Sequence, residues 1–196
     1  MNRFLYCVLT LSVAAFASAQ ENPLAKTSVG DWAKYTINRT NETIPMMSAK
    51  DQPYWRYAMV VLDDAVRING QYYVGENKAT DGGTIHSLKD RFEPVSGLGN
   101  SKYVKVVSTA KEQVTVAGKK YDCVKIVRKV DQPVDETNFT ASWVGTSTLW
   151  VSTAVPLGLV KMENAYHTKL NKEDDGMKIK ETWVLTEYGF KNWPEE

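Results

Sequence analysis

The sequence predicts an all-β protein: a strongly curved antiparallel sheet of about nine or ten hairpin-connected strands, forming a half-barrel or open barrel with little helix. After residue 30, apolar and polar residues alternate with the period that a half-buried strand requires. No segment longer than about two turns shows the apolar spacing of an amphipathic helix. The chain carries 6 Trp and 10 Tyr, and wide aromatic side chains fill the concave side of a bent sheet. So many strands are expected to curl or close, because open edges invite aggregation.

The first 19 residues have the pattern of a cleaved signal peptide. Asn2 and Arg3 form a short polar start, residues 4–16 are an almost uncharged apolar run, and residues 17–19 are the small-x-small pattern that a signal peptidase accepts. The apolar run is too short to span a bilayer. We therefore expect residues 1–19 to be removed, residues 20–196 to form a single β domain, and the protein to be exported to the periplasm or the extracellular space.

The first predicted strands lie between residues 33 and 74. Alternation over residues 33–37 predicts the first strand, and the apolar run 57–68 predicts a second. That run ends at Asn69-Gly70, a dipeptide that favours a two-residue hairpin turn, which would place Val66 opposite Tyr73. The Asp63-Asp64 pair inside the run is interpreted as a bulge or a bend.

The middle of the chain contains the least regular segment and then two further hairpins. Residues 77–101 are expected to be a long connection with one helical turn starting at Ser87. Strand patterns follow at 103–108 and 113–117, and Gly118 closes a turn into 120–130. This last run carries apolar residues on both faces, which is typical of an interior strand covered on two sides.

The C-terminal third predicts the remaining strands. Residues 131–142 are polar and are expected to form an exposed loop, followed by a short strand at 149–152. The sequence 155–158 is a turn, and the strand pattern resumes over 159–170. From Met177 onward, apolar and polar residues alternate again to complete a hairpin.

The charge balance of the chain limits its possible partners, and its cysteine content indicates what stabilises the fold. Lys plus Arg number 24 and Asp plus Glu 23; the leader contributes one Arg and no acid, so 24 − 1 = 23 basic residues balance 23 acidic ones. Nucleic acid is therefore not an expected partner. No further apolar segment is long enough to span a membrane after processing. Only Cys123 remains outside the leader, so no internal disulfide is expected and the hydrophobic core must hold the fold.

Patterns for catalysis, metals and cofactors are weak throughout the chain. His86 and His167 are the only histidines and are far apart in sequence, whereas metal ligands usually cluster. The acidic pairs at 63–64 and 173–175 fit solvated turns better than a glycosidase pair or a calcium loop. We expect no enzyme activity, no catalytic residue, no metal and no cofactor.

Three patches of the chain resemble a known group of proteins. They are Gly30-Asp31-Trp32 with Tyr35, the segment 116–126, and 149–152 followed by 155–161. This pattern resembles that of uncharacterised exported bacterial β-sheet proteins, which are similar in turn to the half-barrel superfamily of the periplasmic lipoprotein carrier. The resemblance implies a curled sheet whose concave face holds an acyl chain.

The sequence therefore predicts an exported, non-enzymatic protein that binds a lipid or other apolar ligand in the concave face of its sheet. The residues expected to line that face are Tyr35, Trp150, Met162, Tyr166 and Trp183, with the loop 81–100 as a gate. The alternative is a structural or protein-interaction module of the cell envelope. The partners expected under these two hypotheses are a lipid or apolar small molecule, and an envelope protein.

Overall fold

The computed structural model describes residues 22–74, 76–80, 82–89, 103–133, 142–169 and 176–193, with only the backbone of residues 74 and 132. The predicted leader lies outside these residues. The described chain folds into one ten-stranded antiparallel sheet. Its strands are β1 Trp32–Asn41, β2 Ala49–Val61, β3 Ala65–Val74, β4 Asn77–Thr80, β5 Thr84–Ser87, β6 Val104–Val116, β7 Lys119–Pro133, β8 Ser142–Val151, β9 Leu159–Lys169 and β10 Lys178–Gly189; two 3-10 helices are η1 Pro23–Lys26 and η2 Pro45–Met47.

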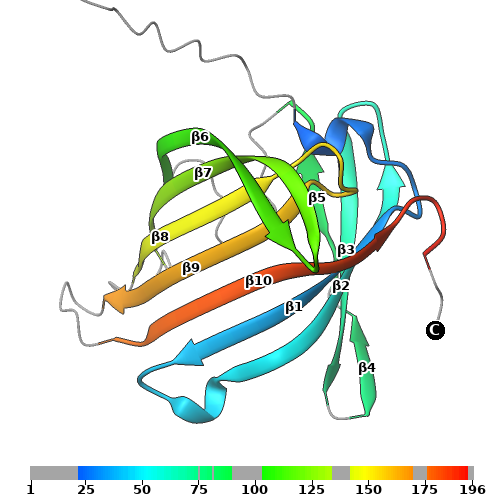
Figure 1. The fold of residues 1–196 in the computed structure, drawn as a ribbon. Helices are drawn as coiled ribbons and strands as arrows, with labels where there is room; N and C mark the ends of the chain where they lie inside the picture. The colour runs from blue at the N-terminus through cyan, green and yellow to red at the C-terminus, as the bar shows by residue number, and fades with distance from the viewer. Residues whose placement is uncertain are drawn as a thin grey trace, which may run out of the picture.

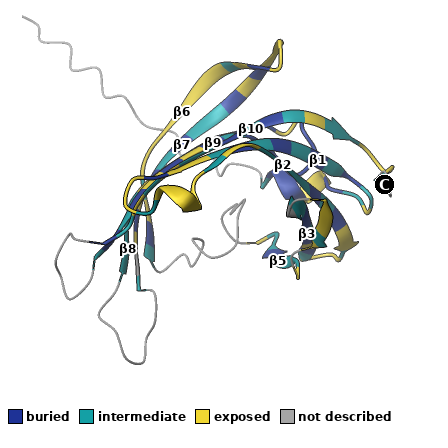
Figure 2. Cartoon of the chain, turned by 90° about the horizontal axis from the view of Figure 1, so that it is seen from below, coloured by how far each residue is buried: buried dark blue, intermediate teal, exposed yellow. Residues whose placement is uncertain are grey.

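The sheet consists of two hairpin meanders that meet at β1 and β10. The strand order is β4-β3-β2-β1-β10-β9-β8-β7-β6, and β5 pairs with β3 further along the edge that also holds β4 (Figure 1). Seen from below, the sheet bends into an arch (Figure 2). Among the described strands, no ladder joins β6 to β4 or β5, so the arch stays open. The predicted all-β, strongly curved antiparallel sheet is confirmed.

Strict alternation separates a buried face of the sheet from a wetter one. In β1, Ala33, Tyr35 and Ile37 are buried, whereas Lys34 and Thr36 between them are partly exposed. The same alternation continues across the neighbouring strands. We call the buried side the concave face; its central row of cross-strand partners is Ile37, Trp183, Met162, Leu149 and Ile126, from β1 through β10, β9 and β8 to β7.

The prediction of a hairpin at Asn69-Gly70 is wrong. Both residues lie inside β3, where Gly70 pairs with Arg56 of β2. The chain reverses instead at Asp63-Asp64. Next to this reversal, the Leu62 N–H donates a hydrogen bond to the Ala65 carbonyl over 2.8 Å. The two acids thus form an exposed bend that joins β2 to β3, in agreement with the predicted bend and solvated turn, and not a bulge. Gly70 has no side chain to compete for the space that the buried Arg56 side chain occupies beside it.

The hairpin of β6 and β7 is longer than the sequence predicts. The predicted strands 103–108 and 113–117 are parts of one strand, β6 (Val104–Val116), whose register with β7 shifts between Val106 and Ser108. The expected turn at Gly118 is confirmed, with φ of +47° at Ala117 and +75° at Gly118. As predicted, β7 is an interior strand, paired with β6 on one side and β8 on the other.

Other boundaries differ from the predicted ones in extent. The segment expected to be irregular contains β4 and β5. Ser87 ends β5 and residues 88–89 form a bend, so no helical turn starts at Ser87 in the part that is described; residue 90 and most of the predicted gate lie outside the described residues. β7 continues to Pro133 and β8 begins at Ser142, so only part of the predicted loop 131–142 remains between them, and residues 134–141 are not described.

One end of the arch is filled by apolar residues from two connecting segments. Leu24 of η1 and Leu157 of the β8–β9 turn are each almost fully buried in the main core cluster. That turn needs positive φ at Leu157 (+60°) and Gly158 (+74°). The Tyr35 hydroxyl donates to the Leu159 carbonyl over 3.1 Å and ties β1 to the start of β9. The core therefore sits on the concave face at this end of the arch.

The reactivity of Cys123 tests whether this side chain of β7 is buried in the core. The side chain is 4 % exposed, and burial raises the pKa of its thiol to about 11. Because the thiolate is the reactive species, we expect iodoacetamide at pH 8 to leave Cys123 unmodified in the folded protein and to alkylate it in guanidinium chloride, as measured by peptide mass spectrometry. A Thr115→Cys variant, exposed on β6, should be alkylated in both conditions; rapid alkylation of Cys123 in the folded protein would contradict its placement.

Candidate ligand-binding face

Four aromatic side chains from four adjacent strands meet on the concave face. Tyr35 of β1 and Trp183 of β10 have ring centroids 5.8 Å apart, and Tyr54 of β2 lies 5.0 Å from Trp183 at an angle of 62°. Tyr72 of β3 stacks on Tyr54 at 6.3 Å. We call these four residues the aromatic wall. Tyr35 and Trp183 are buried, whereas Tyr54 and Tyr72 remain partly exposed, so the wall has one accessible end.

The cross-strand register explains why these rings meet. Tyr35 pairs with Tyr54, and Tyr54 pairs with Tyr72, so three tyrosines form one row across the sheet. Burial raises the pKa of the Tyr35 hydroxyl well above its ordinary value, and the positive charge of Arg56 acts in the opposite direction. Tyr35 therefore stays protonated and keeps its hydrogen bond throughout the physiological range.

Met162 and Tyr166 lie on the concave face but in different clusters. Met162 is paired with Trp183 and belongs to the main core. Tyr166 packs with Val104, Val130 and the partly buried Trp143 in a second, smaller cluster. Tyr166 pairs with Gly145 of β8, where a Cβ would collide with the Tyr166 ring and the Ala165 carbonyl. A glycine at this position leaves room for the ring.

A row of polar side chains separates the two concave clusters. In register from β1 to β7 it contains Arg39, Glu181, Asn164, Ser147 and Arg128. Arg39 donates from Nε to Glu181 over 2.7 Å, and Arg128 donates to the Ser147 hydroxyl over 3.0 Å. Asn164 is 5 % exposed and its Oδ1 has no hydrogen-bond partner among the described residues. The concave face is therefore polar across its middle.

A second polar group lies beside the aromatic wall. Arg56 is 5 % exposed and shares the concave face of β2 with Tyr54, two residues before it. Its Nη2 lies 3.4 Å from Nε2 of the buried His86 on β5. Because a guanidinium can only donate, this contact requires an unprotonated Nε2 on His86.

Trp150, expected on the concave face, lies on the opposite side of the sheet. It pairs with Lys125 and Lys161, and both ammonium groups lie over its ring, 5.1 and 4.7 Å from the centroid. Its Nε1 donates to Glu112 of β6 over 3.0 Å. The hydrogen bond from Trp150, followed by that from Lys125, holds the pKa of the Glu112 carboxyl below its ordinary value. The hydrogen bond from Trp150 to Glu112 thus connects β8 to β6 on the outer face of the sheet.

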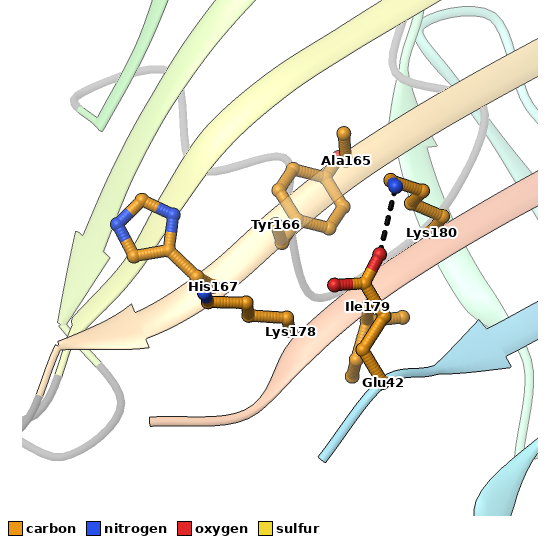
Figure 3. A pocket seen from close by; sticks show the side chains of 7 residues that line it. All are labelled: Glu42, Ala165, Tyr166, His167, Lys178, Ile179 and Lys180. Carbon is orange, nitrogen blue, oxygen red and sulfur yellow. Dashed lines mark ion pairs between the residues drawn. The ribbon is translucent and has the colours of Figure 1, made fainter. Parts of the chain in front are cut away.

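Two of the open hollows that described residues line lie away from the aromatic wall. One, of about 500 Å³, is lined by β6 and β7 beside Cys123. The other, of about 300 Å³, lies over β9 and β10 beside Glu42 (Figure 3). There the Glu42 carboxylate and Lys180 ammonium pair over 2.7 Å, and this contact lowers the pKa of Glu42 and raises that of Lys180. In Figure 3 the His167 ring points away from that pair.

The described residues contain no group of three or more His, Cys, Asp and Glu side chains placed to hold a metal ion. Within the same residues, no helix has the length and apolar character needed to cross a membrane.

The structure brings together three of the predicted residues, Tyr35, Met162 and Trp183, and places Tyr166 further along the same face. Sequence reasoning missed Tyr54, Tyr72 and Arg56. The sequence did contain a signal for them: Tyr54 and Arg56 alternate with Trp55 on one strand, and Tyr72 alternates with Tyr73 on the next, so each set lies on one face. The misplaced turn at Asn69-Gly70 concealed it, because the wrong hairpin assigns β3 a different partner.

No family model matches the chain, and no curated protein matches it. Its fold is similar to the crystal structure of a predicted exported protein with a YmcC-like fold from Bacteroides fragilis, with a TM-score of 0.42 and 11 % identity over 83 % of this chain and 97 % of that one. A predicted lipoprotein from Parabacteroides distasonis gives a TM-score of 0.40 and 11 % identity over 83 % and 96 % of the two chains. The relation to the lipoprotein-carrier superfamily therefore stays a prediction from the sequence.

Proposed function

We propose that this protein is exported, has no enzymatic activity, and binds a lipid or another apolar ligand against the concave face of its sheet. The observation that carries the proposal is the aromatic wall, whose partly exposed end continues into the buried Trp183 and Met162. Apolar ligand sites are lined mainly by aromatic and aliphatic side chains with a few polar groups. The signal-peptide pattern of residues 1–19 supports export.

Native mass spectrometry of the protein purified without detergent tests this proposal. We expect the spectrum to contain a species heavier than the polypeptide alone, and solvent extraction to release the bound apolar compound. Added monopalmitoylglycerol should bind and should raise the melting temperature, since a ligand that binds only the folded state stabilises it.

A matched pair of variants locates the binding face. Tyr54→Glu places a charge on the accessible end of the wall, whereas Tyr73→Glu places the same charge on the outer face of the neighbouring strand, where Tyr73 packs edge-on against Trp55 at 5.6 Å. We expect Tyr54→Glu to lose ligand binding and Tyr73→Glu to retain it. Equal binding by both variants, or a ligand-free wild-type protein that also binds no added amphiphile, would disprove the proposal.

An envelope-interaction module is the second candidate, favoured by exposed apolar side chains at one corner of the sheet. Val29, Met59 and Phe190 are 58 %, 47 % and 58 % exposed. Gly30 donates to the Ala58 carbonyl, and a Cβ on Gly30 would lie 3.2 Å from the backbone of Lys191, so the three apolar residues flank one junction. If this candidate is correct, a Phe190→Ser variant should lose a cross-linked envelope partner and keep the amphiphile binding of the wild type.

A further inference from the structure

Arg56 carries a positive charge into the apolar interior, and no carboxylate of the described residues balances it. The side chain is 5 % exposed, and its Nη1 is buried with no hydrogen-bond partner among the described residues. Its one described polar contact is the 3.4 Å approach of Nη2 to His86 Nε2. In the ranges that the structure covers, no Asp or Glu forms an ion pair with Arg56. The guanidinium therefore retains both its charge and an unused donor.

His86 does not neutralise this charge. Arg56 donates to Nε2, so the imidazole must accept there, and a neutral ring is the only form that can do so. Removing an ion from water without an opposite charge costs several kcal/mol in a protein interior. Buried charges are accordingly found paired or hydrogen-bonded. Arg56 departs from that rule, and an anion from outside the chain would restore it.

Small residues flank Arg56 across the sheet, so an acidic group would reach its buried Nη1 by moving the side chains that cover it. Its cross-strand neighbours are Ala33 on one side and Gly70 on the other, the first with a single methyl group and the second with no side chain. Tyr54 precedes it by two residues on the same face and leads to Trp183, 5.0 Å from the Tyr54 ring. A charged site and an apolar surface therefore adjoin on one strand.

We propose that Arg56 binds the acidic head group of a single-chain amphiphile, a carboxylate or a phosphate, while the acyl chain lies against Tyr54 and Trp183. This inference rests on the proposed function and specifies its ligand class. A guanidinium offers two parallel N–H donors to a carboxylate or phosphate. The Nη1 that has no partner in the protein is one such donor.

Three amphiphiles that share one acyl chain separate the head-group contribution from the chain contribution. The probes are palmitate, palmitoyl lysophosphatidate and monopalmitoylglycerol, each titrated below its micellar concentration into the purified protein. Hydrogen bonds to a charged group contribute enough to change affinity by about tenfold or more. We expect the wild type to bind at least one of the two acids about tenfold more tightly than the neutral glyceride. The relative affinities of palmitate and lysophosphatidate show whether the natural head group is a carboxylate or a phosphate.

The variant Arg56→Met removes the charge and keeps the length of the side chain. We expect its preference for the acids to vanish while its affinity for monopalmitoylglycerol stays within about threefold of the wild type. Its melting temperature without ligand should be equal to or above that of the wild type, because an uncompensated buried charge has been replaced by an apolar group. The matched control is Arg67→Met, an exposed arginine on β3, which should keep the preference.

The outcomes distinguish this inference from the proposed function. If wild type and Arg67→Met bind none of the three probes, the proposed function fails. If the wild type binds all three equally, or if Arg56→Met retains the preference for the acids, the head-group assignment is overturned and the proposed function stands. Should Arg56→Met not fold, Arg56→Lys replaces it: the lysine keeps the charge without the paired donors and should bind the acids with intermediate preference.

Discussion

Trp183→Ala is expected to lower the free energy of unfolding by about 3–5 kcal/mol, the range for removing a buried tryptophan. Trp183 packs against the rings of Tyr35 and Tyr54 and pairs across the sheet with Met162. Its Nε1 also donates to Glu181 over 2.8 Å, so the substitution removes a polar contact with the apolar ones. Denaturation in urea, followed by circular dichroism, measures the change.

The neighbouring Thr182 provides the matched control for this prediction. It lies on the opposite face of β10, directly before Trp183 in the chain, and is partly exposed. Thr182→Ala should change the free energy of unfolding by less than about 1 kcal/mol, and Trp183→Phe should fall between the two. A loss in Trp183→Ala no larger than that in Thr182→Ala would show that the aromatic wall is not part of the folded core.

Asp31→Ala is expected to lower the free energy of unfolding by about 3 kcal/mol, because two backbone N–H groups lose a charged acceptor. The Asp31 carboxylate is 2 % exposed and accepts from the Ser28 N–H over 2.8 Å and from the Lys191 N–H over 3.0 Å. It therefore joins the chain before β1 to the chain after β10. Urea denaturation of Asp31→Ala and of Asp131→Ala, an exposed aspartate on β7, compares the two.

A second measurement tests the position of this contact as well as its strength. Hydrogen exchange at the Lys191 N–H should accelerate in Asp31→Ala and stay slow in Asp131→Ala. If exchange at Lys191 is fast in the wild type, the carboxylate does not hold the C-terminal segment and the expected loss of stability has no basis.

The junction around Asp31 gives a structural reason for one part of the sequence resemblance. Gly30 has φ of +84°, which favours glycine, and its N–H donates to the Ala58 carbonyl. The Asp31 carbonyl accepts from the Ala58 N–H. Trp32 lies 6.1 Å from the Trp193 ring. Each residue of Gly30-Asp31-Trp32 thus fastens the start of the sheet, so this motif reports on architecture and not on a ligand.

Alternation and turn chemistry predicted most strands, because several of them have one face exposed to solvent. The period of two in β1, β9 and β10 follows their burial directly. The same reasoning failed at Asn69-Gly70, because a hairpin turn there requires positive φ and Gly70 instead stays extended beside the bulky Arg56. The turn preference of a dipeptide depends on its own residues only, so it carries no information about Arg56, which lies on another strand.

The candidate face was predicted in part for a similar reason. Tyr35, Met162, Tyr166 and Trp183 sit in alternating segments, so their side was readable from the sequence. Trp150 lies in a run where Leu149, Trp150 and Val151 are all buried. Both faces of β8 are covered there, one by the core and one by the β6–β7 hairpin, so apolar character does not tell which way the indole points. Arg56 could not be anticipated, because a buried unpaired cation contradicts the pattern that sequence analysis relies on.

Among the described strands, β6 is not hydrogen-bonded to β4 or β5, so this border does not fix the curvature of the arch. In a barrel whose ladder is continuous, the circumference is fixed by strand number and stagger, and widening the interior would break interstrand bonds. Here the radius of curvature can change while every ladder is retained. Under the proposed function, such a scaffold would accept ligands of different bulk, and its selectivity would depend on anchoring groups more than on the dimensions of the interior.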